Sequence, residues 1–209
     1  TARALSNSAS DLDSLKSNID LAISTIQSAI DGIDAITELV NQAKGLASNA
    51  KATGDTNERS TLAVQFNELL SQIDTIANDS SFNGTNLLQA SPDNLAVEFN
   101  SANTSNLTIT GLDATTASTG INIAVAANNF GLNANIDTAL TAISSALTTL
   151  RSNASTMGSN NTILSTRLNF TENLVNTLEG GEGKLTLADL NEESANLLAL
   201  QTRQQLGIN

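Results

Sequence analysis

The stretch LDSLKSNIDLAISTIQSAIDGIDAITELV, residues 12–40, decides the fold of this chain. Apolar side chains recur in it at alternating spacings of three and four residues, which is the seam of a coiled coil. The same spacing continues on both sides, through Leu5, Ser8, Leu12, Leu15, Ile19, Ala22, Ile26, Ala29, Ile33, Ile36, Val40, Ala43 and Ala47. A helix from Leu5 to Ala50 would be roughly 70 Å long, and a helix of that length must lie along a partner.

A second helix is predicted after a polar turn. The turn is KATGDTNERS, residues 51–60, which contains a glycine and connects the two helices. The second helix is expected from about Thr56 to Asn78, with Asp55 or Thr56 as its N-cap and the acidic Glu58 in its first turn.

The last third of the chain returns to the coiled-coil spacing. Its seam residues are Ile136, Leu140, Ile143, Leu147, Leu150, Ala154, Met157, Asn161, Leu164, Leu168, Thr171, Val175 and Leu178. Two of them, Asn161 and Thr171, are polar, and polar seam residues can fix the register of paired helices at a cost in stability. EGGEGK, residues 179–184, predicts a break, followed by a final amphipathic helix from about Thr186 to Leu206.

A tight turn is predicted where DSSFNGTNLLQ, residues 79–89, follows the second helix. Asn83 and Gly84 both tolerate positive φ, so this pair is a strong hairpin signal. The apolar residues around it, Phe82, Leu87 and Leu88, indicate that the turn is held against the side of the helical bundle.

Residues 94–130 alternate in polarity, as in Leu107 and Ile109 or in Ile121, Ile123 and Val125. This period is typical of short β-strands and hairpins, which we expect to form the far end of the bundle.

Together these patterns predict a mainly α protein, an elongated bundle of long coiled-coil-like helices with a β-hairpin and a small β-rich insertion. The two long helices, about 5–50 and 135–179, pair with each other, and the second helix packs beside them. Residues 1–90 form the N-terminal part of the helical core with the hairpin, 91–134 the β-rich insertion, and 135–209 the C-terminal helices. Gly32, in mid-helix, costs roughly 1 kcal/mol relative to alanine, and close approach of another helix is its expected reason.

Composition excludes several classes of function. The net charge is −12, from 21 acidic and 9 basic residues, and no basic cluster exists to bind nucleic acid or an anionic membrane surface. No apolar run is long enough to cross a bilayer. The chain contains neither cysteine nor histidine, so thiol chemistry, the usual zinc sites and histidine acid–base catalysis are absent. We therefore expect no enzyme activity, no metal and no cofactor.

Candidate chemical groups have simpler structural explanations. The carboxylate pairs Asp11/Asp13, Asp31/Asp34 and Glu192/Glu193 lie on predicted polar helix faces, without an aromatic platform or a calcium-loop pattern. The glycines of EGGEGK follow a helix rather than a strand and lack the phosphate-loop spacing. Arg151, Arg167 and Arg203 are among the few cations of an acidic chain and are compatible with pairing inside the chain or with acidic faces of identical neighbours.

Four segments resemble bacterial flagellins. They are ITELVNQAKGLASNA (36–50), LLSQIDTIANDSSFNGTNLL (69–88), LTTLRSNASTMGSNNTILSTRLNFTENLVNTLE (147–179) and LTLADLNEESANLLALQTRQQLG (185–207). The resemblance covers residues 1–90 and 135–209, whereas 91–134 matches the variable outer part of the family only by its position.

The resemblance implies a structural subunit that is exported unfolded through the flagellar type III apparatus and assembles with identical copies into the extracellular filament used for motility. An export chaperone and a filament cap protein are its implied partners. The long helices would form the outer core layer of the filament (the D1 domain), and Phe82, Asn83 and Gly84 would lie in subunit contacts along a protofilament. The terminal D0 helices of the family have no counterpart in residues 1–209, so we expect this chain alone not to polymerise.

The family's receptor-contacting arginine, leucine and glutamate correspond to Ala35, Leu39 and Gln65. Only the leucine is kept, so we expect weak or no recognition by the innate immune receptor for flagellin.

Three other functions remain as alternatives. A hook–filament junction (hook-associated) protein would share the long-helix core. An enzyme inserted at 91–134 is opposed by the absence of histidine and cysteine. A secreted coiled-coil adhesin would be unrelated to flagellin.

Overall fold

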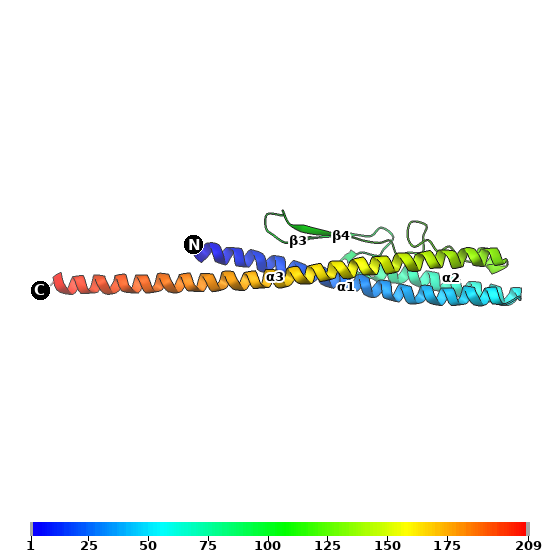
Figure 1. The fold of residues 1–209 in the computed structure, drawn as a ribbon, viewed down its shortest axis with the longest axis horizontal. Coiled ribbons are helices and arrows are strands. Elements are labelled where there is room, and N and C mark those ends of the chain that lie inside the picture. The colour runs from blue at the N-terminus through cyan, green and yellow to red at the C-terminus, as the bar shows by residue number, and fades with distance from the viewer. Residues whose placement is uncertain (1, 208–209) are drawn as a thin grey trace.

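A computed structural model describes residues 2–207 and has the shape of a long helical rod (Figure 1). Two long helices, α1 (Ala2–Ala52) and α3 (Asn133–Gly207), run antiparallel along each other, and α2 (Thr56–Asp79) packs beside α1. The segment between α2 and α3 contains the short strands β1 (Ser81–Phe82) and β2 (Thr85–Asn86), the hairpin β3 (Asn94–Glu98) and β4 (Asn106–Thr110), and the 3-10 turn η1 (Ala127–Phe130). The predicted mainly α rod is confirmed.

The coiled-coil seam of α1 is buried as predicted over most of its length. Ile19, Ile26, Ile36 and Val40 are fully buried, and the alanines between or after them allow close approach of α3; these are Ala22, Ala29, Ala43 and Ala47. Near its N-terminus the seam shifts by one residue, because Ala9 is buried and Ser8 is exposed. Every predicted seam residue of α3 is buried or half-buried.

The predicted break at residues 179–184 is wrong, because α3 is one continuous helix through this segment. Each glycine costs a helix about 1 kcal/mol, but helix formation is cooperative and strong helix formers flank the segment on both sides. Gly181 still packs on α1, since a Cβ built on it would lie 3.6 Å from Cδ1 of Leu5. The predicted separate helix from Thr186 to Leu206 is therefore the end of α3.

The start of α2 agrees with its sequence signal. Asp55 is the N-cap, and its Oδ1 accepts hydrogen bonds from the backbone N–H groups of Asn57 at 2.7 Å and Glu58 at 3.1 Å. These bonds satisfy two of the free N–H groups at the helix start.

The predicted Asn-Gly hairpin is present. Ser81 pairs with Asn86 and Phe82 with Thr85, and the turn residues Asn83 and Gly84 have φ of 50° and 81°. Both φ values are positive, as the tight hairpin turn requires.

Leu87 and Leu88, which follow this hairpin, are fully buried in the main core, as predicted. Phe82 is not, because its side chain remains 36% exposed.

The β-rich insertion is smaller than predicted and lies elsewhere. β3 and β4 form an antiparallel hairpin, but Ile121 and Ile123 lie in an irregular segment whose N–H groups bond to Thr115 O and Thr116 O. Both isoleucines are buried, so burial rather than strand pairing explains the alternation. The β3–β4 hairpin lies along the side of the rod and contacts α1; it does not form the far end (Figure 1).

Gly32 is required by a close approach, although not of a helix. A Cβ at this position would lie 2.3 Å from Ser80 Oγ and 2.7 Å from Leu88 Cδ1. The segment that leaves α2 therefore crosses α1 at Gly32.

Buried residues of the ranges 1–90, 91–134 and 135–209 contribute to one hydrophobic cluster. The three-part division of the chain stays a prediction.

Candidate functional site

The β1–β2 turn is exposed on the side of α1. Phe82, Asn83 and Gly84 all reach solvent. The structure thus brings these three predicted site residues together at one exposed point.

Beside the turn, a groove of 230 Å³ is lined by Asn18 and Leu21 from α1, by Asn83 and Thr85 from the hairpin, and by Leu95 from β3. Leu21 is 45% exposed, so the groove offers both apolar and amide groups to a neighbouring molecule.

Asn86 holds this turn in place, and the sequence analysis missed it. Its Nδ2 donates to the carbonyls of Ala77 at 3.0 Å and Asn78 at 2.9 Å, at the end of α2. Its Oδ1 accepts from the N–H groups of Leu88 at 2.7 Å and Gln89 at 3.1 Å. One buried amide therefore joins the end of α2 to the segment that enters the core.

Ala35, Leu39 and Gln65 lie on two neighbouring helices. Leu39 and Ala35 are half-buried on α1, and Leu39 packs against the core, whereas Gln65 is exposed on α2. Gln65 lines a 640 Å³ groove between α1 and α2 together with Gln42, Asn49, Glu68 and Gln72, above the half-buried Leu46 and Leu69. Ala35 and Leu39 are not among the lining residues.

The carboxylate pairs singled out from the sequence lie on exposed helix faces. The side chains of Asp11, Asp31, Asp34 and Glu192 are exposed, and Asp31 accepts a hydrogen bond from Gln27 Nε2 at 2.8 Å. Within residues 2–207 no three acidic side chains are grouped closely enough to hold a metal ion. No helix of this range combines the length and hydrophobicity needed to span a membrane.

At the end of the rod where α1 turns into α2, several contacts join three chain segments. Arg59 donates from Nε to Thr53 O at 2.9 Å and from Nη2 to Asn133 Oδ1 at 2.7 Å. Nearby, the rings of Phe66 and Phe130 meet edge to face, with centroids 5.1 Å apart. The sequence offered no signal for Arg59, because its partners lie far apart along the chain.

The three arginines singled out from sequence have different surroundings. The guanidinium carbon of Arg167 lies 4.8 Å from the centre of the Phe99 ring, a cation–π contact with the loop after β3. Arg151 and Arg203 are exposed, and neither belongs to the two ion pairs found in residues 2–207.

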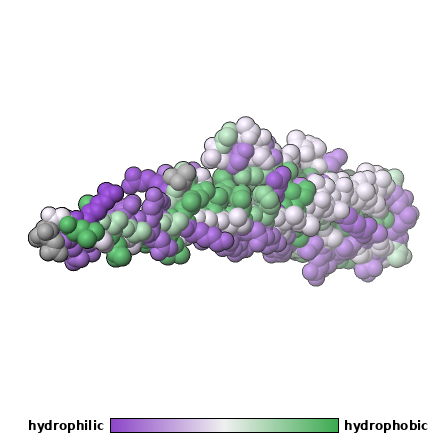
Figure 2. Space-filling model, turned by 60° about the vertical axis from the view of Figure 1, so that its left-hand side comes forward, coloured by the Kyte–Doolittle hydropathy of each residue, from purple (hydrophilic) through white to green (hydrophobic). Residues whose placement is uncertain are grey.

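The C-terminal part of α3 extends beyond the N-terminus of α1 (Figure 1). From Gly183 to Gly207 every residue is exposed. The large apolar residues among them are Leu185, Leu187, Leu190, Leu197, Leu198, Leu200 and Leu206. Figure 2 shows apolar and polar side chains side by side on this extension.

Comparison with known proteins gives consistent matches over the whole chain. Residues 1–93 match the bacterial flagellin N-terminal helical region, and residues 140–209 match the bacterial flagellin C-terminal helical region. Flagellin FljK of Caulobacter vibrioides is 33% identical over 215 residues, which cover 100% of this chain and 75% of the relative. A flagellin of Brucella melitensis is 28% identical, covering 91% of this chain and 70% of the relative.

A solved structure shares the fold. The crystal structure of Bacillus cereus flagellin matches 74% of this chain and 88% of its own length, with a TM-score of 0.62 and 20% sequence identity.

Proposed function

The chain belongs to the bacterial flagellin family, and from this premise we propose how its rod takes part in a filament. Flagellins are structural subunits of the bacterial flagellar filament, and this chain is such a subunit. The observation that carries the assignment is the long antiparallel pair of α1 and α3, formed by the two segments that match the family's helical regions. The hook–filament junction protein is not favoured, since the matching relatives are flagellins.

The exposed β1–β2 turn is proposed as a contact between subunits along a protofilament. Phe82 supports this proposal, because it is a 36% exposed aromatic residue in a chain with 2% aromatics. The bonds of Asn86 fix the turn before any neighbour binds, so little conformational entropy is lost on contact.

Electron microscopy tests both proposals. The chain is compared with an extended chain, which carries the terminal helices that the family resemblance implies, at equal concentration. We expect long filaments from the extended chain, and their absence would contradict the assignment as a filament subunit.

Within the extended chain, Phe82→Ala is matched with Val64→Ala, because Val64 is an exposed apolar residue of α2. A turn in subunit contacts predicts a higher critical concentration for assembly only for Phe82→Ala. Equal critical concentrations would remove the turn from the interface and leave the filament assignment intact.

Export is proposed from family membership. Flagellins form an extracellular filament, so the chain needs secretion, which we assign to the flagellar type III apparatus with an export chaperone and a cap protein. Secretion of the chain from cells with an intact export apparatus, and its retention in cells lacking the export ATPase, is the expected result. Equal secretion from both strains would contradict it.

Weak recognition by the innate immune receptor is also a proposal. A methyl group at Ala35 and an uncharged amide at Gln65 cannot form the charge-assisted hydrogen bonds of an arginine and a glutamate. Receptor activation in reporter cells should be low for the wild-type chain and should rise for Ala35→Arg combined with Gln65→Glu. Strong activation by the wild-type chain would disprove the proposal.

A further inference from the structure

Asn83 and Gly84, at the tip of the β1–β2 turn, form the one Asn-Gly pair in the chain. An asparagine amide can react with the backbone nitrogen of the residue that follows it, and a side chain on that residue crowds the nitrogen. Only one of the exposed asparagines with positive φ precedes a glycine, and the others precede residues with bulkier side chains. These asparagines are Asn83, Asn103, Asn122, Asn128 and Asn129.

The backbone nitrogen of Gly84 is accessible to such a reaction. Its N–H takes part in none of the hydrogen bonds found in the described part of the chain. A Cβ built on Gly84 meets no heavy atom within 4 Å beyond its chain neighbours. After Asn103, by contrast, the N–H of Thr104 donates to Asn100 Oδ1 at 3.0 Å. Asn83 therefore differs from Asn103 both in the missing Cβ and in the free nitrogen of the next residue.

The turn is fixed at its base and not at its tip. The side chain of Asn86 bonds β2 to the end of α2, and Phe82 pairs with Thr85. The two tip residues can therefore change conformation while the residues around them stay in place. Because the amide and the nitrogen belong to adjacent residues, the reaction is intramolecular, which favours it over attack by a separate molecule.

We propose that Asn83 is a site of spontaneous deamidation in the free subunit, and that the subunit contact proposed for the turn protects it. The protection rests on the proposed function, whereas the reaction does not. In the first step the nitrogen of Gly84 bonds to Cγ of Asn83, and the bond from Cγ to Nδ2 breaks. Nδ2 leaves as ammonia with the proton of the Gly84 N–H, and a five-membered succinimide ring remains. One water molecule then opens the ring.

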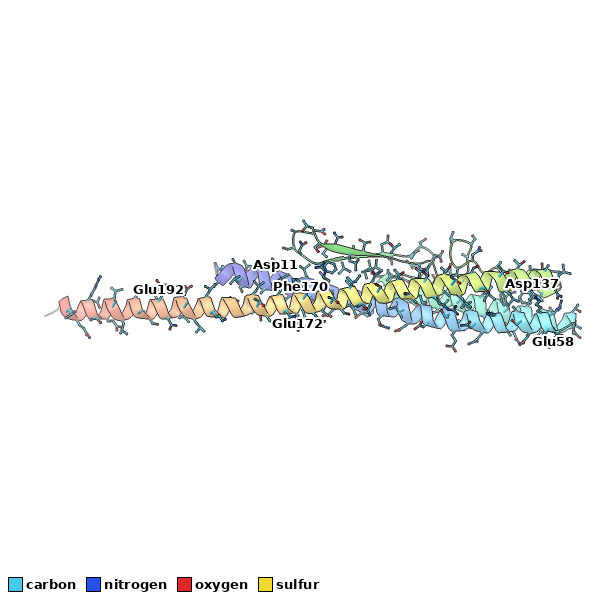
Figure 3. All side chains as sticks on the ribbon, in the orientation of Figure 1. Asp11, Glu58, Asp137, Phe170, Glu172 and Glu192 are labelled. Carbon is cyan, nitrogen blue, oxygen red and sulfur yellow. The ribbon has the colours of Figure 1, made fainter. Side chains whose placement is uncertain are left out.

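Ring opening gives aspartate or isoaspartate, depending on which carbonyl the water attacks. Both products place a carboxylate in residues 80–92, a segment without any charged residue. The acids that Figure 3 labels all belong to helices; they are Asp11, Glu58, Asp137, Glu172 and Glu192. The new carboxylate would share the groove beside the turn with Glu98. Isoaspartate also adds a methylene group to the backbone, which a two-residue hairpin turn does not accommodate.

A neighbouring subunit on the turn would slow the reaction. It would restrict the movement of the tip and exclude the water that opens the ring. Once the carboxylate has formed, its burial in the same contact is unfavourable because no cation lines the groove to pair with it. We therefore expect a reacted subunit to join a filament less readily than an intact one.

Peptide mapping by mass spectrometry measures the reaction in the free chain. The chain is incubated in buffer at physiological temperature, and the fraction of each asparagine converted to the acid is followed with time. We expect Asn83 to react faster than Asn103 by about an order of magnitude or more, because Gly84 leaves the attacking nitrogen uncrowded. Methyl transfer by a protein isoaspartate methyltransferase detects the second product.

Gly84→Asn isolates the effect of the missing side chain. The consecutive residues Asn128 and Asn129 have φ of 49° and 47°, so a pair of asparagines can adopt the positive φ values that the turn requires. Deamidation of Asn83 should slow by about an order of magnitude in this variant. The modification site is overturned if Asn83 reacts no faster than Asn103, or equally fast in Gly84→Asn.

The extended chain tests the protection. Deamidation of Asn83 is compared between assembled filaments and free subunits kept below the critical concentration, and we expect it to be several-fold slower in the filaments. Asn83→Asp carries the aspartate product from the start. Asn83→Gly is its matched control, because glycine keeps the positive φ and removes the amide. We expect a several-fold higher critical concentration for Asn83→Asp than for Asn83→Gly.

The outcomes separate the claims. Equal deamidation rates in filaments and free subunits, or equal critical concentrations of the two variants, remove the turn from the subunit contact and leave the deamidation site standing. An unreactive Asn83 in the free chain overturns the deamidation site and leaves the filament function standing. An extended chain that forms no filaments overturns the filament function, while the reaction in the free chain is measured without it.

Discussion

Replacing Asn86 by alanine should destabilise the subunit more than any other single change to an uncharged polar side chain near the β1–β2 turn. The residue is 3% exposed and forms four side-chain hydrogen bonds, two with carbonyls at the end of α2 and two with N–H groups of residues 88 and 89. Alanine can make none of these bonds. The bonds to Ala77 O and Leu88 N are buried, so these two groups lose their partners without gaining water.

The magnitude follows from those two groups. Each buried polar group left without a partner costs about 1–3 kcal/mol, so the two groups together predict a loss of about 2–6 kcal/mol in the free energy of unfolding. The two outer bonds, to Asn78 O and Gln89 N, are partly exposed, so water replaces the amide there at little cost. Asn86→Asp should be equally harmful, because a carboxylate would face the carbonyls of Ala77 and Asn78 with no hydrogen to donate.

Urea unfolding followed by circular dichroism at 222 nm measures this difference. The matched control is Asn78→Ala, in which an exposed asparagine of α2 is truncated and its backbone carbonyl is kept. The control should change the free energy of unfolding by less than about 0.5 kcal/mol, as is usual for surface positions. If the free energies of unfolding of Asn86→Ala and Asn78→Ala differ by less than about 0.5 kcal/mol, the Asn86 amide does not hold the turn, and the reasoning is refuted.

Four further substitutions test the packing of the rod by the same unfolding measurement, and amide exchange is added for the last of them. Gly32→Ala should lower the free energy of unfolding by about 1–3 kcal/mol, because its Cβ would overlap Ser80 and force the crossing segment away. Gly45→Ala should raise the free energy of unfolding by about 1 kcal/mol, because a Cβ added at Gly45 would meet no heavy atom within 4 Å. A gain in stability at both positions would contradict the close approach at Gly32. Asn161→Leu should raise the free energy of unfolding by about 1–3 kcal/mol, because the Oδ1 of Asn161 is buried without a hydrogen-bond partner. A lower free energy of unfolding would indicate that the amide stabilises the seam. Gly180→Ala should gain about 1 kcal/mol of helix stability and slow amide exchange around it; unchanged exchange would mean that the helix is not continuous there.

Sequence reasoning succeeded where one local rule decides the structure. The seam from Ile19 to Ala47 and the seam of α3 follow from a single spacing repeated along the chain. The Asn83-Gly84 turn follows from the tolerance of two residues for positive φ. In each case the information lies within a few neighbouring residues, so no knowledge of the tertiary fold is needed.

It failed where distant segments meet or where a weak local preference is overruled. The glycines of residues 179–184 disfavour a helix, yet the good helix formers on both sides carry it through. Asn86 and Arg59 act through partners that only the fold brings near, and a polar residue in a loop gives no sign of that. The apolar residues Ile121 and Ile123 alternate with polar ones because one side of their segment is buried. An irregular segment with one buried side shows the same alternation as a strand, so the pattern alone cannot tell the two apart.

Packing is distributed unequally along the rod, and this distribution bears on assembly. Where α1, α2 and α3 lie together, aromatic and aliphatic side chains such as Phe66 and Ile143 are fully buried. Beyond Gly183, α3 buries no side chain, so its helix depends on local propensity alone, and isolated helices are marginal in water. We therefore expect burial of its exposed leucines against other chains to stabilise this part of the helix.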